Sequence, residues 1–106
     1  MFARTVTVRL KANMVGDFKK TLENEILPLL RRQTGFQDEI TLVAPEGNEA
    51  VGISLWDSKQ NAEAYQRATY PEVQKLLSKV IDGTPQVKQY EVPVSTIQKT
   101  RGAGST

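Results

Sequence analysis

A strand that runs directly into a helix, over residues 50–65, constrains this chain more than any other segment. Successive side chains of a strand point to opposite faces, so every second residue shares a face. The aliphatic residues share one face, which we expect to be the core: Val51, Ile53 and Leu55. The other face carries three small residues and then the only tryptophan of the chain: Ala50, Gly52, Ser54 and Trp56. The space beside one large ring predicts that a second sheet or a ligand packs on this second face.

The strand ends at a strand-to-helix corner. Asp57 and Ser58 are both residue types that cap helices, because their side chains accept hydrogen bonds from the free N–H groups of the first turn. Asp57 and Gln60 also have the spacing of a capping box. We therefore expect Trp56 at the end of the strand, directly before the helix that carries Tyr65.

Cysteine and histidine are both absent from the chain, and this excludes several kinds of chemistry. Without cysteine there is no disulfide, no thiolate ligand and no thiol nucleophile. Without histidine there is no Ser-His-Asp triad, no imidazole metal ligand and no histidine-ligated haem. We therefore expect no metal and no cofactor.

Length and charge describe one ordinary domain. The chain has 106 residues, of which 39% are hydrophobic and 25% charged, as in soluble globular proteins. Its net charge is +2, and the basic residues are interleaved with acidic ones, which disfavours a nucleic-acid partner. No apolar run approaches the length of a signal peptide or a membrane span, so we expect no membrane contact and a cytoplasmic location.

Alternation of apolar and polar residues predicts three strands besides the one that ends at Trp56. They cover residues 3–11, 36–43 and 87–97. Because proline cannot donate to a strand ladder, Pro93 confines the last strand to an edge, a bulge or a bend. The turn formers of residues 45–49 predict an antiparallel hairpin between the second and third strands.

Helical spacing predicts two helical regions. The first covers residues 14–32, with Asn13 as its cap and a bend just before Pro28, which has no backbone N–H. The second begins after the strand-to-helix corner and breaks before Pro71, a residue suited to the first turn of a new helix. An apolar helical stripe then continues to Ile81.

The order β-α-β-β-α-β predicts the ferredoxin-like α+β class, a four-stranded antiparallel sheet with helices on one face. The domain is expected over residues 1–98. Residues 99–106 are expected to be a flexible C-terminal tail, because they contain no large apolar residue to anchor them. The second sheet face must then be solvated, paired with another sheet or used for binding.

Proteins that bind single-stranded RNA share this topology. They stack bases on aromatic residues of the two central strands. The first strand here offers Thr5, Thr7 and Arg9 instead, and the third offers only Trp56 at its end. RNA binding is therefore disfavoured.

Several segments carry a resemblance to a known family: Trp-Asp-Ser at 56–58, Tyr65, and residues 27–30, 33–36, 70–73 and 87–92. Together they resemble the antibiotic biosynthesis monooxygenase (ABM) family over about residues 3–97. The resemblance implies a dimeric α+β barrel. In such a barrel a homodimer forms through the open sheet face and the last strand, and a cavity lies between the sheet and the helices.

The family includes cofactor-independent oxygenases of polycyclic anthrone-like substrates and haem-degrading enzymes. The haem-degrading branch is a poor match, because it uses a histidine near Lys75 and Leu76 and an asparagine in the first strand. The resemblance therefore implies a small aromatic or apolar ligand. The chain would be either a cofactor-independent monooxygenase or a non-enzymatic ligand-binding or dimeric assembly module.

Trp56, Tyr65 and Arg9 are the candidate site residues. For Trp56 and Tyr65 the alternative is a packing role on an inward-facing surface, where a buried tyrosine hydroxyl needs a partner. Arg9 alternates with the apolar residues of the first strand and lies on the face opposite to Val6 and Val8. There it would hold an anionic or phenolate ligand, or it would be paired across a dimer interface.

Overall fold

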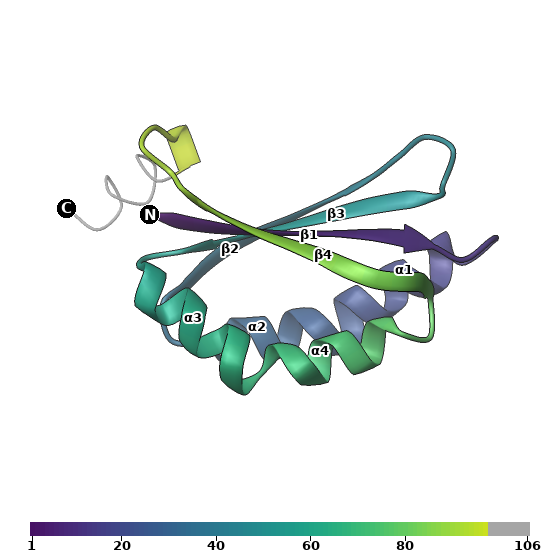
Figure 1. Ribbon diagram of the computed structural model, residues 1–106, viewed down its shortest axis with the longest axis horizontal. Helices are drawn as coiled ribbons and strands as arrows, with labels where there is room; N and C mark the ends of the chain where they lie inside the picture. Colours follow the sequence, from purple (N-terminus) through teal and green to yellow (C-terminus); the bar gives the residue numbers. More distant parts are fainter. Residues whose placement is uncertain (98–106) are drawn as a thin grey trace.

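Four antiparallel strands and two helical segments form two layers in the computed structural model, which describes residues 1–97 (Figure 1). The strands lie in the order β2-β3-β1-β4, and the two helical segments cover one face of the sheet. Their bounds are Phe2–Leu10 for β1, Phe36–Val43 for β2, Glu49–Trp56 for β3 and Ile81–Glu91 for β4. The predicted ferredoxin-like α+β class is confirmed. The predicted tail over residues 99–106 lies outside the described residues.

The first helical segment is continuous but contains a π-helical turn. It consists of α1 (Val15–Thr21), η1 (Leu22–Ile26) and α2 (Leu27–Arg31). Because Pro28 cannot donate a hydrogen bond, the turn before it is widened, and the N–H of Leu27 bonds to the carbonyl of Leu22. The prediction of one helix interrupted near Pro28 is therefore confirmed. The predicted cap is wrong, because Met14 occupies the cap position and Asn13 has a φ of 61°.

The second helical segment begins at the predicted corner. It consists of α3 (Lys59–Ala68) and α4 (Tyr70–Leu77), with Pro71 in the first turn of α4. Ser58 is the cap of α3, and its hydroxyl accepts a bond of 3.2 Å from the backbone N–H of Asn61. Asp57 instead accepts from the side-chain amide of Asn61 at 2.8 Å. The capping box of Asp57 and Gln60 is therefore wrong.

The last strand lies earlier in the chain than predicted. Helix α4 ends at Leu77, and β4 runs from Ile81 to Glu91 rather than over residues 87–97. Ile81 pairs with Leu10 of β1, and the register then shifts before residues 86–91 pair regularly. Gly83 has a φ of 73° in this irregular stretch, and β4 is an edge strand, so Pro85 is tolerated within it. Pro93, which we expected inside the strand, lies after its end at Glu91, so that placement is wrong.

The two faces of the sheet are reversed relative to our expectation for β3. Small residues and the tryptophan face the helices together with the even-numbered residues of β1, and we call this the covered face: Phe2, Arg4, Val6, Val8, Leu10, Ala50, Gly52, Ser54 and Trp56. Two of the aliphatic residues that we expected in the core, Val51 and Ile53, lie half-buried on the opposite, open face. Leu55 lies on the same open face but is buried, with 6% of its surface exposed, so its predicted burial is confirmed. Two amphipathic helices need a sheet surface with room for their own large side chains, and the small residues of β3 supply it.

A bulge in β2 directs one further residue to the covered face. Phe36 pairs with Trp56, but Asp38 pairs with Leu55, so Gln37 is an extra residue. As a result Phe36 and Glu39 both face the helices, although Glu39 follows Phe36 by three positions. Without this bulge, residues 36 and 39 of a regular strand would lie on opposite faces.

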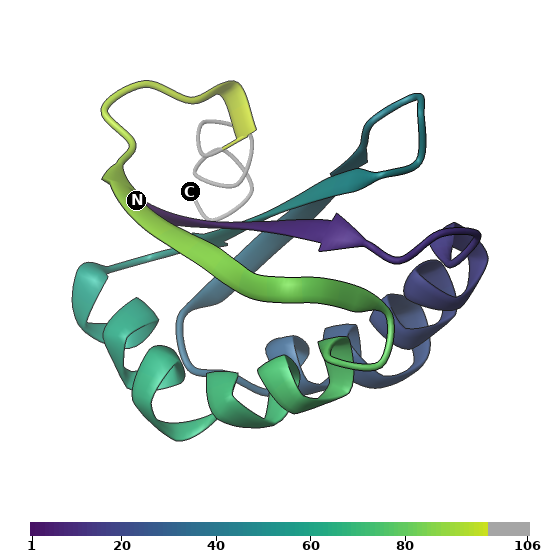
Figure 2. The same cartoon turned by 45° about the vertical axis from the view of Figure 1, so that its right-hand side comes forward.

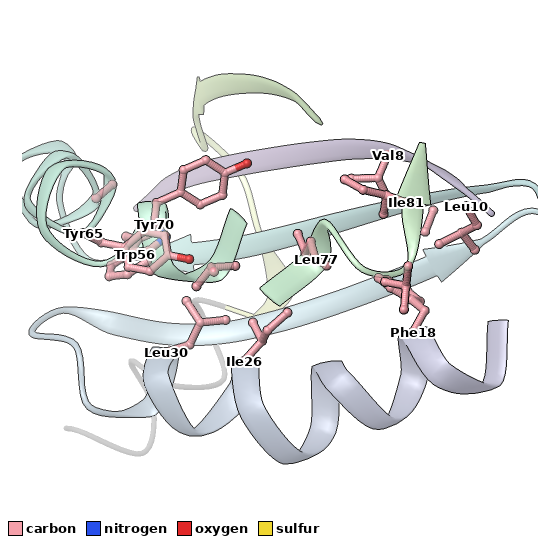
Figure 3. Packing of buried hydrophobic residues seen from close by; sticks show 14 of the residues in the cluster. Val8, Leu10, Phe18, Ile26, Leu30, Trp56, Tyr65, Tyr70, Leu77 and Ile81 are labelled. Carbon is pink, nitrogen blue, oxygen red and sulfur yellow. The ribbon is translucent and has the colours of Figure 1, made fainter. Parts of the chain in front are cut away.

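The core fills the space between the covered face and the helices (Figure 3). Figure 2 shows both helical segments beneath the sheet and the segment after β4 above it, on the open side. The labelled core residues come from every element except β2, and include Val8, Phe18, Ile26, Trp56 and Leu77.

Candidate functional site

A cavity lies within the core, between the covered face and both helical segments. Gly52 and Ser54 form part of its wall, where larger side chains would fill it. Its volume is about 60 Å³, and the cavity is open to solvent on one side. A closed cavity of roughly 150 Å³ holds a benzene ring, so a single-ring ligand would extend into the open approach.

The walls of the cavity are mostly apolar. The helices contribute Phe18, Leu22 and Ile26 from the first segment and Val73 and Leu77 from the second. A few polar groups interrupt this apolar lining, and they come from β1, β2 and the middle of the second helical segment: Arg4, Glu39, Thr41, Tyr65 and Tyr70. An apolar pocket with few convergent polar groups is the usual form of a small-molecule site.

Arg4 is the most unusual of these groups, because its charged side chain is only 1% exposed. Its guanidinium carbon lies 5.0 Å from the ring centre of Tyr65 and 4.6 Å from that of Tyr70, within the range of cation–π attraction. One terminal nitrogen donates to the side-chain oxygen of Gln66 in α3. Burial lowers the pKa of Arg4, while the neighbouring Tyr65 and Tyr70 raise it. Burial still leaves this group a cation, because an arginine in a protein does not lose its proton.

Two polar atoms beside the cavity have no partner among the described residues. They are Nε of Arg4 and the hydroxyl of Tyr70, and both are buried. A buried donor without an acceptor is unfavourable by about 1 to 3 kcal/mol, and more when it is charged. Figure 3 shows Tyr70 in the group of aromatic residues with Tyr65 and Trp56. Both groups could be satisfied by an acceptor bound in the cavity.

Tyr65 lines the cavity, whereas Trp56 lies behind it. Trp56 is 0% exposed, and its indole N–H donates to the Ser54 hydroxyl at 2.9 Å. Its ring is 5.0 Å from that of Tyr65 and 5.6 Å from that of Phe36. Burial raises the pKa of Tyr65 to about 12, despite the opposing effect of Arg4. Trp56 therefore supports the position of Tyr65 from outside the cavity.

Glu39 is the carboxylate of the cavity. Thr41 donates to its Oε2 at 2.7 Å, and the same oxygen lies 3.3 Å from the point where a β-carbon would stand on Gly52. Burial raises the pKa of Glu39, Thr41 lowers it and the neighbouring charge of Asp38 raises it further. Glu39 is therefore a partly desolvated carboxylate held over the small residue of β3.

The structure brings together two of the three predicted site residues. Trp56 and Tyr65 are in ring contact, but Arg9 is exposed on the open face of β1. Arg9 instead borders a more polar hollow near the β2–β3 hairpin and the start of β4. The sheet thus separates Arg9 from the cavity.

Sequence reasoning missed Arg4, Glu39 and Tyr70 as site residues. For Arg4 a signal existed, because it shares the even-numbered register of Val6 and Val8 and is the one charged residue in that apolar series. For Glu39 no local signal existed, since its direction depends on the bulge at Gln37. For Tyr70 the sequence indicated a helix break rather than a cavity wall.

Two further classes of site find no support in residues 1–97. No group of three or more acidic residues there is arranged to hold a metal ion. In the same part of the chain, no helix has both the length and the apolar character needed to span a bilayer.

Similar structures identify the fold. A monooxygenase from the gene ActVA-Orf6 of Streptomyces coelicolor, solved with the ligand nanaomycin D, has a TM-score of 0.76, 17% identity and coverage of 89% of this chain and 88% of its own. SnoaB, a cofactor-independent oxygenase from Streptomyces nogalater, has a TM-score of 0.72, 13% identity and coverage of 90% and 95%. The fold is that of the ABM proteins.

A third neighbour agrees with this identification. A Bordetella bronchiseptica protein, provisionally named an antibiotic biosynthesis monooxygenase, has a TM-score of 0.73, 18% identity and coverage of 88% of this chain and 97% of its own. No protein-family model matches the sequence, and no curated protein matches it. At these identities the likeness concerns the ABM fold alone.

Proposed function

We propose that this ABM-like chain binds a small aromatic or apolar metabolite in the cavity between the covered face and the helices. The observation that carries the proposal is a mostly apolar cavity beside Gly52 and Ser54, between the sheet and the helices. Neighbours of the same fold include a monooxygenase solved with the ligand nanaomycin D and a cofactor-independent oxygenase. Both are consistent with a ligand site in a protein of this architecture.

The proposed reaction is oxygenation of the bound molecule without metal or organic cofactor. The substrate would lose a proton and supply electrons as a stabilised carbanion or phenolate. Conversion of a CH₂ group to a carbonyl by dioxygen then releases one water, so that dioxygen takes up the four electrons that the carbon loses. The protein must supply an apolar pocket, donors to an oxyanion and exclusion of bulk water. Tyr65 lies in the wall of such a pocket.

The second candidate is a non-enzymatic binding module with the same cavity. It is favoured by the small volume of the cavity, about 60 Å³, which leaves little enclosed space for a polycyclic substrate. Titration with single-ring and polycyclic aromatic ligands, followed by oxygen-uptake measurements, separates the two candidates. Binding together with oxygen uptake supports the enzyme, and binding without uptake for every oxidisable ligand supports the module.

A cavity-filling variant tests the location of the site. Gly52→Ala places a methyl group 3.3 Å from the Glu39 carboxylate and reduces the cavity, so we expect ligand affinity to fall about tenfold. Gly16→Ala is the matched control, because a methyl group there meets no atom within 4 Å. Equal affinities of both variants and the wild type would place the ligand elsewhere.

We also propose that the open face forms a homodimer. Several large apolar side chains remain exposed there, including Ile40 at 40%, Leu42 at 52% and Tyr90 at 49%. Ile40 and Leu42 of β2 lie opposite Ile53 and Val51 of β3, whereas Tyr90 lies on β4 at the other edge of the sheet. An exposed apolar patch such as that on β2 and β3 is typical of an interaction surface. The family resemblance implies a homodimer that forms through this same face and the last strand. Sedimentation at low micromolar concentration is the direct measurement, and a monomer there would contradict the dimeric barrel.

A further inference from the structure

The polar groups of the cavity are unequally distributed. Arg4 and Tyr70 lie together, with the guanidinium carbon 4.6 Å from the tyrosine ring centre. Both have one buried polar atom without a partner among the described residues, Nε in Arg4 and the hydroxyl in Tyr70. Both atoms are hydrogen-bond donors, so an acceptor, and an anionic one above all, is the complement that they lack.

The carboxylate of Glu39 lies toward the other side of the same cavity. Arg4 and Glu39 both pair with Ser54, from β1 and β2 respectively, so they stand in one row across three strands. Neighbouring strands are about 4.8 Å apart, so the backbones of these two residues are separated by about 10 Å. Only the small side chain of Ser54 stands between them in that row.

Within residues 1–97, no carboxylate is among the groups that act on the charge of Arg4. The two groups that favour the charged form of Arg4 are Tyr65 and Tyr70, which are neutral at physiological pH. A buried charge is stabilised only when it is paired and hydrogen-bonded. The aromatic rings and the bond to Gln66 supply part of this stabilisation and leave the Nε donor free.

We propose that Arg4 and Tyr70 form an oxyanion-binding subsite, and that Glu39 on the far side of Ser54 orients the ligand by repelling its negative end. The cavity therefore selects a small aromatic molecule that carries a negatively charged oxygen, either a phenolate or a carboxylate. This inference rests on the proposed function, because it requires a ligand in the same cavity. It names the chemical class of that ligand and the residues that choose it.

Three probes of similar shape test the inference: 4-nitrophenol, 4-nitrobenzoate and neutral nitrobenzene. Calorimetry at pH 8 gives the affinity for each, and the absorbance of bound nitrophenol shows whether it is ionised. We expect the wild type to bind at least one anion about tenfold or more tightly than nitrobenzene. The two anionic probes distinguish a phenolate site from a carboxylate site.

Arg4→Met removes the charge and keeps an unbranched apolar side chain. We expect it to abolish the preference for anions while changing nitrobenzene affinity less than about threefold. Arg9→Met is the matched control, because Arg9 is on the same strand but on the open face. Arg4→Lys should retain part of the anion preference, since it keeps the charge and loses the Nε donor.

Two milder variants keep the proposal falsifiable if Arg4→Met does not fold. Tyr70→Phe removes one hydroxyl and should weaken anion binding about three- to tenfold. Glu39→Gln removes the repulsion and should tighten anion binding. Asp38→Asn, on the open face of the same strand, should leave anion binding unchanged. Equal binding of anions and nitrobenzene by the wild type would overturn the subsite and leave the proposed function standing. Failure of all three probes to bind would overturn both.

Discussion

The two arginines of β1 show how differently the two faces of one sheet treat the same residue. Arg4 on the covered face is 1% exposed, between two tyrosine rings and beside a cavity. Arg9, five residues later, is exposed on the open face. An exposed guanidinium keeps its hydration, whereas a buried one must obtain its stabilisation from neighbouring rings, acceptors or a ligand. The buried charge of Arg4 on the covered face therefore indicates a binding site more strongly than the exposed charge of Arg9 does.

The largest difference between the faces should appear in stability. Trp56→Ala removes a fully buried ring from the covered face, and we expect a loss of about 3 to 5 kcal/mol in the free energy of unfolding. Leu42→Ala on the open face should lose less than about 1 kcal/mol in the monomer, because Leu42 is 52% exposed. Chemical denaturation at low protein concentration measures both. Similar losses for the two variants would contradict the assignment of one covered and one open face.

A milder change at the same position separates packing from binding. Trp56→Phe should lower stability by about 1 to 3 kcal/mol and leave ligand affinity nearly unchanged, because Trp56 lies behind Tyr65 and not in the cavity wall. Thermal unfolding and calorimetry give the two quantities. Weakened binding with an unchanged melting temperature would instead make Trp56 part of the ligand site.

The open face should control assembly rather than folding. Leu42→Lys introduces a charge into the exposed apolar surface, and we expect the dimer dissociation constant to rise about tenfold or more, which corresponds to about 1.4 kcal/mol. Sedimentation across a range of concentrations is the measurement. As a control, Glu63→Lys on α3 adds positive charge on the helical layer, away from the open face, and should leave the dissociation constant unchanged. Equal weakening by both variants would argue against the open face as the interface.

The smallest expected effect concerns the pH dependence of stability. Burial raises the pKa of Glu39 above that of a glutamate in the unfolded chain, so the folded state keeps this proton to higher pH. Above the unfolded value of about 4.3, the folded state therefore binds more protons, and stability falls as the pH rises through the folded pKa. The groups around Glu39 are Thr41 and Asp38 on β2 and Tyr65 on α3.

Glu39→Gln should remove this fall in stability, and denaturation midpoints between pH 4 and pH 8 measure it. Glu49→Gln controls for the loss of a carboxylate from the sheet, since Glu49 is exposed at the start of β3 and is not among the groups that act on Glu39. If Glu39→Gln showed the same pH slope as the wild type, the carboxylate would be better solvated than its position over Gly52 indicates.

Local sequence patterns determined most of the elements of this fold, because helix and strand periods are properties of neighbouring residues. The period of two marked β1, β2 and β3, and Pro28 marked the interruption of the first helical segment. The last strand was misplaced for a local reason as well. Val80 and Ile81 continue a helical spacing, but Ile81 gains more from pairing with Leu10 than from another helical turn.

Only the tertiary structure decided which face of the sheet the helices cover. Both faces of β3 are apolar enough to be buried, so alternation alone cannot choose between Val51, Ile53 and Leu55 and the face that ends in Trp56. The choice depends on volume, since the helices bring large side chains that need the small residues of β3 opposite them. The same choice placed Arg4 inside and Arg9 outside, and the bulge at Gln37 turned Glu39 into the cavity. These directions follow from how distant segments fit together, which no window of neighbouring residues contains.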